Sequence, residues 1–302
     1  NFSNNLLYQF GVSSPHLQSL SGMAIYIQYS IGIFNHCYFY NNSAYTKTDS
    51  KKCSVTSSDT LYYDESTGSI ENTIFYNNSA TILALYGDYY PMCEGGALNC
   101  WTREISCTNC SFTNNSCFCL AETKMIRGGA VFCCGGNFTN CCFSDNTALI
   151  GGHFYYNQMK KYIGNGYISN LINLIECNFT STHDNNGYVK NLFYMEIEYN
   201  ISSTFNKIVN CQFNFINMNQ LILFDGSADE YFDYSVGDFL VPFLKILFDN
   251  NCVSGYDDIV FKNVDLPLYD EFAQINKTIE TAFTKICINS IICIPHFYDN
   301  SP

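Results

Sequence analysis

The sequence predicts an all-β fold, a right-handed parallel β-helix of about seven to nine coils with extruded loops. Two recurring words and the composition support this prediction. The word Phe-x-Asn/Asp-Asn, as in CYFYNNSA (37–44) and CSFTNNSC (110–117), returns every 31 to 37 residues. A Gly-Gly-Ala word precedes it by 15 to 17 residues, as in GGALNC (95–100) and GGAVFC (128–133). Charged residues make up only 14% of the chain and aromatic residues 17%, a composition that favours strands over helices.

The Phe words predict one strand in each coil. Their anchoring residues are Phe39, Phe75, Phe112, Phe143, Phe179, Phe213 and Phe248. In Cys-Ser-Phe-Thr (110–113), the period-2 alternation places the cysteine and the phenylalanine on one face. We therefore expect small and aromatic side chains to stack inward as parallel ladders.

The opening words predict another strand in each coil. They occur at 22–27, 58–63, 95–100, 128–133, 151–156, 191–197 and 220–224. The shortest interval, the 23 residues from Gly128 to Gly151, suits three short strands and three turns. The variable stretches between the words are expected to be loops extruded from a constant coil. They are 47–58, 86–94, 157–167 and 225–238.

The repeats set the expected domain organisation. Residues 1–224 should form the β-helix, and residues 225–302 should form degenerate terminal coils, a cap or a docking region, because the words weaken after Gly187. The alternative fold is a β-sandwich, in which turns recur every 8–12 residues and strands do not repeat the same words.

One asparagine follows each anchoring phenylalanine by three residues, where the strand must turn. These residues are Asn42, Asn78, Asn115, Asn146 and Asn251. Asparagine tolerates the left-handed backbone that a turn requires, and stacked amides can hydrogen-bond along a stack. We expect an inward asparagine ladder at this corner, and we expect Gly-Gly to form another sharp corner.

The 17 cysteines are dense, and an odd number cannot all pair with one another. Aligned copies would place Cys100 beside Cys133, Cys110 beside Cys141, and Cys177 beside Cys211, at a strand spacing of ~4.8 Å that a disulfide can bridge. Such a density in a chain with few charges favours an oxidising compartment. One alternative is a ladder of buried thiols. Another is a zinc cluster formed by Cys107, Cys110, Cys117 and Cys119.

Acceptor motifs for N-glycosylation, Asn-x-Ser/Thr, are abundant. They begin at Asn1, Asn41, Asn77, Asn109, Asn114, Asn137, Asn178, Asn200 and Asn276. Asn41, Asn77 and Asn114 each stand one residue before a ladder asparagine, so their side chains should point outward. The alternative is that these asparagines are only turn residues.

No word in the sequence points to catalysis. The Gly-His-Gly and Arg-x-Lys words of β-helical galacturonan hydrolases do not occur, and no Ser/His/Asp arrangement is suggested. A weak calcium candidate is the set Asp225, Ser227, Asp229 and Asp233, whose oxygens alternate as in a calcium loop. Glu230 stands where such a loop has glycine, so the alternative is a plain acidic loop.

The repeated words resemble those of the polymorphic membrane proteins of chlamydiae and the similar surface protein families of trichomonad protists. The resemblance rests on Gly95-Gly96-Ala97, on Gly128-Gly129-Ala130 and on the Phe-x-x-Asn copies, and it is good over residues 22–156. It implies a surface-exposed or secreted β-helix that serves in adhesion.

We therefore expect a non-catalytic, secreted or cell-surface glycoprotein that acts in adhesion or in a surface coat, without a cofactor. Its partners would be a protein or glycan of a host or neighbouring cell, or copies of itself, contacted through the extruded loops. One alternative is a subunit of an extracellular filament built by end-to-end or lateral association, and another is a polysaccharide lyase or hydrolase. The net charge of −13 argues against nucleic acid. No apolar run reaches the ~18 residues of a transmembrane helix.

Overall fold

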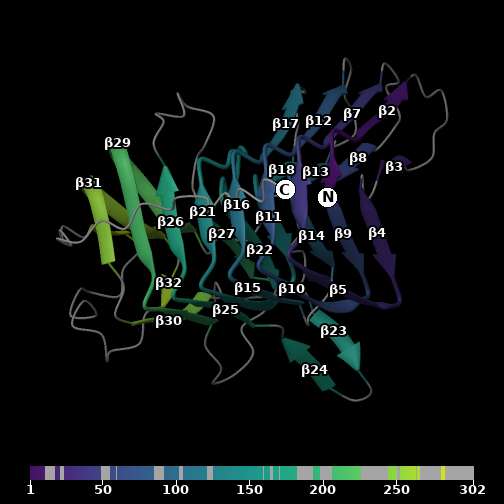
Figure 1. Cartoon of the computed structure of the whole chain (residues 1–302). Coiled ribbons are helices and arrows are strands. Elements are labelled where there is room, and N and C mark those ends of the chain that lie inside the picture. Colours follow the sequence, from purple (N-terminus) through teal and green to yellow (C-terminus); the bar gives the residue numbers. More distant parts are fainter. Residues whose placement is uncertain are drawn as a thin grey trace, which may run out of the picture.

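A computed structural model describes the placement of residues 1–10, 18–20, 24–48, 55–58, 60–84, 92–101, 105–120, 125–158, 160–163, 166–169, 171–181, 193–197, 206–225, 244–249, 252–262, 264–265 and 280–282. These residues form strands, turns and bends, and no helix occurs among them. The strands stack as a parallel β-solenoid (Figure 1). The predicted all-β parallel solenoid is confirmed.

Each turn of the solenoid contains three short strands, and each strand stacks on its equivalents in the neighbouring turns. The first row carries the opening words: β4 (Ile25–Gln28), β9 (Leu61–Asp64), β14 (Leu98–Trp101), β19 (Val131–Cys133), β22 (Phe154–Gln158) and β27 (Phe193–Ile197). The second row is β5 (Ile31–Asn35), β10 (Thr67–Glu71), β15 (Ile105–Thr108), β20 (Gly136–Thr139), β25 (Ile172–Ile175), β28 (Asn206–Val209), β30 (Leu244–Asp249) and β32 (Val264–Asp265). The third row carries the Phe words: β1 (Phe2–Ser3), β6 (Tyr38–Tyr40), β11 (Ile74–Tyr76), β16 (Ser111–Thr113), β21 (Cys142–Ser144), β26 (Asn178–Ser181) and β29 (Gln212–Asp225).

The pairing within the three rows is parallel and keeps one register along the stack. Phe39 pairs with Phe75, Phe75 with Phe112, and Phe112 with Phe143. The ring centroids of these neighbours lie 4.8–4.9 Å apart, and the ring planes are parallel to within 5°. The rings themselves are buried. Burying such a ring contributes roughly 1.5–3 kcal/mol, so the phenylalanine stack is a principal part of the core.

The phenylalanine stack differs from the predicted set at both ends. Phe2 joins it, stacked 4.9 Å from Phe39. Phe248 does not belong to it, because Phe248 lies on β30 in the second row and pairs with Ile208. Val253 pairs with Phe213 instead. The prediction that Phe248 lies in the third row is therefore wrong. The coils differ in length, so a residue that follows Phe213 by about one repeat length can fall on any of the three rows.

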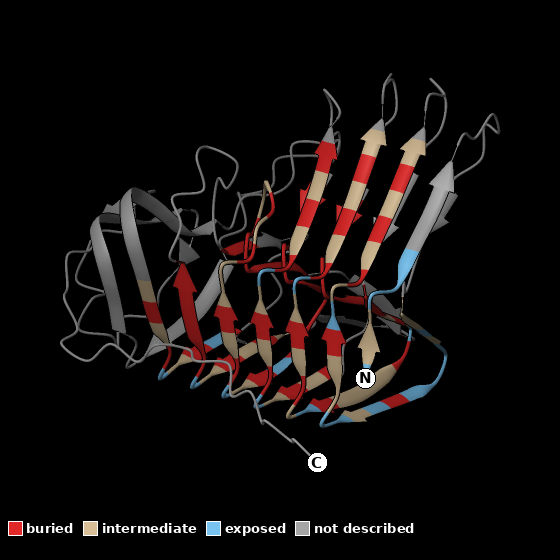
Figure 2. Cartoon of the chain, turned by 45° about the horizontal axis from the view of Figure 1, so that its top comes forward, coloured by how far each residue is buried: buried red, intermediate tan, exposed pale blue. Residues whose placement is uncertain are grey.

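Four successive turns also extend outward as a second structure. An outgoing strand follows the third row and a returning strand precedes the next first row. The outgoing strands form a four-stranded parallel sheet of β2 (Leu6–Phe10), β7 (Ser43–Thr48), β12 (Ser79–Ala84) and β17 (Ser116–Leu120). The returning strands form another, of β3 (Gln18–Leu20), β8 (Val55–Ser58), β13 (Met92–Glu94) and β18 (Met125–Arg127). We call this pair of sheets the fin; its outgoing strands project from the coil body in Figure 2.

The fin corrects part of the prediction of extruded loops. Parts of 47–58 and 86–94 are strands of the fin. The stretch 157–167 contributes to an antiparallel hairpin of β23 (Lys160–Ile163) and β24 (Gly166–Ser169). Residues 226–243 lie outside the described residues.

The far end of the solenoid departs from the coil pattern. β29 is 14 residues long and joins the third row to the first, since it pairs with β26 at one end and β27 at the other. β31 (Cys252–Lys262) pairs with β29 in parallel and with β33 (Glu280–Ala282) in antiparallel. The prediction that 225–302 contains terminal coils, a cap or a docking region stays a prediction.

Candidate functional site

The predicted asparagine ladder is present and buried. Asn42 donates its Nδ2 hydrogen bond to Asn78 Oδ1 at 2.9 Å, and Asn78 donates in the same way to Asn115 at 2.9 Å. Asn115 donates to Asn146 at 3.0 Å. The second Nδ2 hydrogen bond of Asn78 goes to the carbonyl of Phe39 at 3.0 Å. Asn251 lies outside the described residues.

A histidine that the sequence did not mark closes this ladder. Asn146 Nδ2 lies 3.2 Å from Nδ1 of His153, and His153 is fully buried. Burial lowers the pKa of His153 to about 4. The ring is therefore neutral at pH 7 and can accept the asparagine's hydrogen bond.

The Gly-Gly pair forms a corner with two separate requirements. Gly95, Gly128 and Gly151 each adopt a positive φ of about 60° (59°, 63° and 63°), which glycine adopts at no steric cost. The following glycine has no room for a side chain, since a Cβ on Gly96 would lie 2.3 Å from the carbonyl oxygen of Gly129. This corner is scaffold.

The aligned cysteines are in register but are thiols. Cys100 pairs with Cys133, and the amide of Cys142, the residue after Cys141, donates to the carbonyl of Cys110. No disulfide is present among the described cysteines. The structure thus matches the alternative of a buried thiol ladder.

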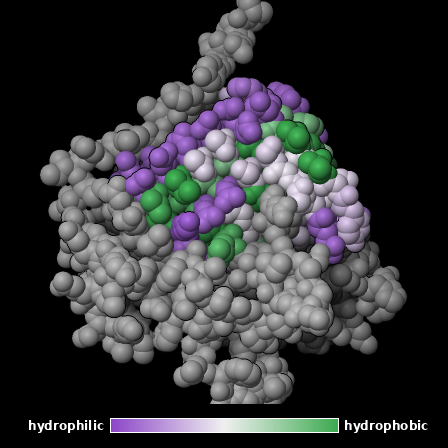
Figure 3. All heavy atoms as spheres, turned by 90° about the horizontal axis from the view of Figure 1, so that it is seen from below, coloured by the Kyte–Doolittle hydropathy of each residue, from purple (hydrophilic) through white to green (hydrophobic). Residues whose placement is uncertain are grey.

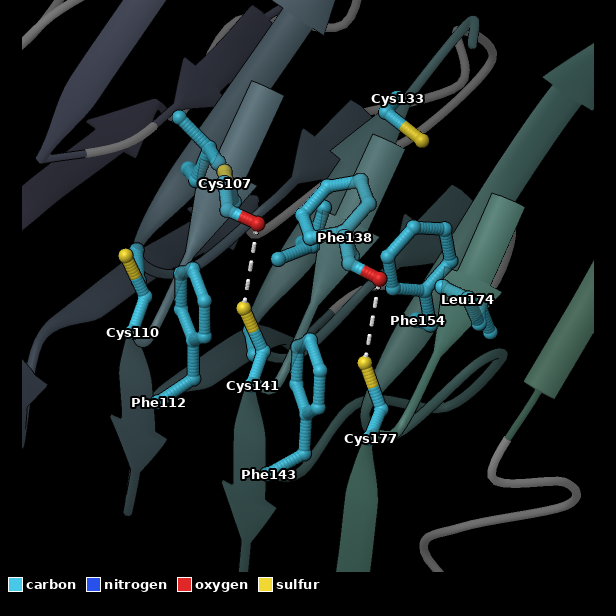
Figure 4. Close-up of a cluster of buried hydrophobic side chains, with 14 of the residues drawn as sticks. Cys107, Cys110, Phe112, Cys133, Phe138, Cys141, Phe143, Phe154, Leu174 and Cys177 are labelled. Carbon is cyan, nitrogen blue, oxygen red and sulfur yellow. Dashed lines mark hydrogen bonds between the residues drawn. The ribbon is translucent and has the colours of Figure 1, made fainter. Parts of the chain in front are cut away.

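At the corner between the second and third rows, the thiols of the ladder contact backbone carbonyls. Cys141 Sγ lies 3.4 Å from the carbonyl oxygen of Thr139 and 3.5 Å from that of Cys107, and its single S–H can donate to either. Cys177 Sγ lies 3.4 Å from the carbonyl oxygen of Ile175 and 3.3 Å from that of Phe138, the contact drawn in Figure 4. Burial raises the pKa of Cys141 and Cys107 well above the ordinary value, which disfavours the thiolate needed for a nucleophile or a metal ligand.

The four cysteines of the predicted zinc cluster lie in two separate cores. Cys107 and Cys110 pack in the core of the solenoid, whereas Cys117 and Cys119 pack in the core of the fin. Within the described ranges no group of three potential metal ligands forms. These cysteines are packing residues.

The fin has its own core and an open outer face. Inward side chains of β12 and β17 pack against the returning sheet in a cluster of Ala80, Ile82, Cys93, Cys117, Cys119, Ile126 and Ala148. The outward side chains of the outgoing sheet are half-exposed. We call them the fin face: Ser43, Tyr45, Lys47, Ser79, Thr81, Leu83, Ser116 and Phe118.

Register orders the fin face into rows. Ser43, Ser79 and Ser116 pair along the stack, and the hydroxyls of Ser43 and Ser79 lie 3.1 Å apart. In the next row Thr81 pairs with Tyr45 on one side and Phe118 on the other. Hydroxyl and aromatic groups on a rigid sheet form a surface that can contact a partner at low entropic cost.

An ion pair anchors the base of the fin. Arg127 Nη1 lies 3.5 Å from Glu94 Oε1, and both side chains are almost fully buried. The Arg127 guanidinium also stands 5.0 Å above the ring of Tyr155 in the first row. The ion pair therefore joins two strands of the returning sheet, and the cation–π contact ties that sheet to the first row of the solenoid.

The outer face of the second row is mostly polar. Outward positions in register along it are Ile33, Ser69, Ser106, Asn137, Asn173 and Lys207. Asn173 donates to Asn137 Oδ1 at 2.7 Å. Viewed from below, the described atoms on this side are mainly hydrophilic or neutral, with some hydrophobic groups (Figure 3).

The predicted glycosylation sites fall into two groups. Asn77, Asn109, Asn114 and Asn137 are exposed and Asn41 is half-buried, whereas Asn178 is only 9% exposed and leaves no room for a glycan on the folded chain. Asn41, Asn77 and Asn114 have φ values of 52°, 53° and 59° at one corner, and Asn77 Nδ2 donates to Asn41 Oδ1 at 2.6 Å. Successive rungs lie ~4.8 Å apart, so a glycan on one would crowd its neighbours. Asn200 and Asn276 lie outside the described residues.

The calcium candidate also falls outside the described part. Of Asp225, Ser227, Asp229 and Asp233, only Asp225 is described, as the last residue of β29.

Comparisons with protein families, with curated proteins and with solved structures give no match. Within the described part of the chain, no helix has the length and apolar character needed to span a bilayer.

Proposed function

We propose that this chain is a non-catalytic, secreted or cell-surface solenoid that acts in adhesion or in a surface coat, and that the fin is its contact surface. The proposal rests on the fin because a coil of the solenoid can close without fin strands. The coil from Gly128 to Ile150 passes from the third row to the next first row without fin strands, through isolated bridges from Thr147 to Ser116 and from Ile150 to Arg127. Four other turns nevertheless build it.

The fin face suits contact with a large partner. It is an open sheet surface, whereas sites for small molecules are concave and bury most of the ligand. Tyr45 and Phe118 supply aromatic area, and the serine row supplies hydroxyls. Tyrosine and serine combine contact area with adaptable hydrogen bonding at low entropic cost.

The extracellular placement is supported by the exposed sequons, the low charge and the resemblance to adhesive surface proteins. The thiols no longer contribute to it, since the aligned cysteines are not bridged. A partner on a host or neighbouring cell, either protein or glycan, is the class that this surface fits.

A charge placed at the centre of the fin face tests the proposal. The purified, labelled chain should bind to neighbouring or host cells, or to members of an array of extracellular glycans and proteins. Thr81→Lys should weaken that binding about tenfold or more, equivalent to about 1.4 kcal/mol, because a lysine would intrude between Tyr45 and Phe118. The control is Ser69→Lys, which adds the same charge on β10, outside the fin.

An equal loss of binding in Thr81→Lys and Ser69→Lys would show that any added positive charge weakens binding and that the fin is not the contact surface. Turnover of an acidic polysaccharide by the wild-type chain would overturn the non-catalytic assignment and support the lyase or hydrolase alternative.

A further inference from the structure

The exposed apolar residues of the described chain are concentrated at one end of the solenoid. The large hydrophobic side chains that are most exposed are Leu6, Tyr26, Tyr29, Ile31, Ile33 and Tyr40. All fall in the first 40 residues, and Ile31 and Ile33 on β5 are 74% and 72% exposed. β5 is the end strand of its eight-stranded sheet, and its exposed positions are visible at the edge of Figure 2.

The register sets these isoleucines apart from the rungs that follow them. In the next five rungs the position of Ile33 is taken by Ser69, Ser106, Asn137, Asn173 and Lys207, and in the rung after these by Leu247. The position of Ile31 is taken by Thr67 in the next rung. The same outer face is therefore apolar where the sheet ends and polar at the Ile33 position in the next five rungs.

The described residues at this end do not supply the usual protection of a sheet edge. Natural proteins shield such edges with charges, prolines or covering segments. Residues 1–46 contain no Asp, Glu, Lys or Arg, although charged residues make up 14% of the chain. Among the described strands, β5 pairs only with β10, and β4 pairs only with β9.

We propose that a second copy of this chain covers this end, with the two β5 strands paired in antiparallel across a twofold axis near Gly32. Two strands related by such an axis run in opposite directions. Ile31 of one copy then lies beside Ile33 of the other, so the four isoleucines pack against one another on the outer face and each loses part of its exposed surface. The absence of charge lets two chains of net charge −13 approach where their repulsion is weakest.

The opposite end favours a closed dimer over a head-to-tail filament. A further coil would have to continue β31 as a parallel strand. β31 already pairs with β33 in antiparallel through Val260–Ala282, Phe261–Thr281 and Lys262–Glu280. End-to-end growth is therefore blocked on this strand. In the twofold dimer both β5 edges are already used, so no third copy can join through the same contact. This inference does not depend on the fin.

The mass of the intact 302-residue chain in solution tests the dimer. Light scattering after size exclusion should give twice 34.3 kDa, and Ile31→Lys with Ile33→Lys should shift it to 34.3 kDa. The control, Ser106→Lys with Thr108→Lys, adds the same charge with the same spacing on β15 and should stay dimeric. Unchanged circular dichroism and melting would show that the variants fold.

Hydrogen exchange on the wild-type chain gives a second readout. Exchange at amides of β5 should slow as the chain concentration rises, while exchange on β15 stays constant. A wild-type chain that remains monomeric, a mass that grows beyond two copies, or a dimer that survives the lysine pair on β5 would each overturn the proposal.

Discussion

Asn78 shows how this chain satisfies polar groups inside an apolar stack. Its Oδ1 accepts from the backbone amide and the side chain of Asn42, and its Nδ2 donates to Phe39 and Asn115. All four hydrogen-bonding positions of the amide are used. A buried polar ladder with this degree of satisfaction fixes the register of neighbouring coils as well as stabilising them.

Asn78→Ala should lower the free energy of unfolding by at least about 3 kcal/mol, because several buried groups would each lose a partner at about 1–3 kcal/mol. Denaturant unfolding measures the change. Asn77→Gly is the matched control: Asn77 is exposed and has φ of 53°, which glycine tolerates, so its effect should stay within about 1 kcal/mol. A loss at position 78 no larger than that at position 77 would mean that the ladder does not hold the coils.

His153 gives the stability a defined pH dependence. Its pKa falls from 6.5 to about 4 in the folded chain, so the unfolded chain binds the proton more tightly. Stability is then fully present above pH 6.5 and is lost as the pH falls from 6.5 to about 4, by about 3 kcal/mol at 1.36 kcal/mol per pKa unit. Asp145 attracts the proton and opposes this shift.

Unfolding free energies of the wild type and of His153→Gln, measured between pH 4 and pH 7, test this dependence. Gln can accept from Asn146 but does not titrate, so the difference between the two proteins should shrink as the pH falls. A difference that is constant with pH would contradict the assignment.

At the scale of elements, the fin is an addition to a coil that closes without it. Replacing residues 117–126 by Ala-Leu, as Ala148 and Leu149 connect the shorter coil, should remove one fin rung and keep the solenoid. The free energy of unfolding should change by only a few kcal/mol, since lost burial is offset by about 1–2 kcal/mol of backbone entropy for each residue no longer ordered. Circular dichroism and thermal melting are the measurements.

The matched control for the fin deletion removes Asn109 and Cys110, at the corner between the second and third rows. After that deletion β15 and β16 cannot both stay in register with the neighbouring coils, so it should unfold the chain. If the fin deletion unfolded the chain as fully as the corner deletion, the fin would be part of the fold.

The rows were predictable from sequence because every coil repeats the same physical demand. Phe39, Asn42 and Gly128 recur at fixed offsets, and a residue that stacks on its own copy leaves a repeating word. The fin was missed because SAYTKT (43–48) alternates small inward with polar outward residues, which reads as a loop. The role of His153 was not predicted because this histidine ends the ladder at one place, and a residue that occurs once produces no repeat in the sequence. The surface at Ile31 and Ile33 was missed for the same reason.

At the scale of the whole molecule, the repeated words account for the scaffold, and the outer surfaces carry what differs. The inward Phe, Asn and Cys side chains stack on one another or form hydrogen bonds within the solenoid. The groups open to a partner are the fin face, the exposed corners and the apolar end. Function is therefore proposed on features that vary from coil to coil.

The stacking register is the central claim, and a pair of engineered cysteines measures it directly. Ser69 and Ser106 pair on neighbouring strands of the second row and point outward, at a spacing of ~4.8 Å within the range of a disulfide. Ser69→Cys with Ser106→Cys should form a disulfide on mild oxidation, detected by mass spectrometry. Ser69→Cys with Asn137→Cys spans two rungs and should not. A bond in the second variant but not in the first would contradict the stacked solenoid described above.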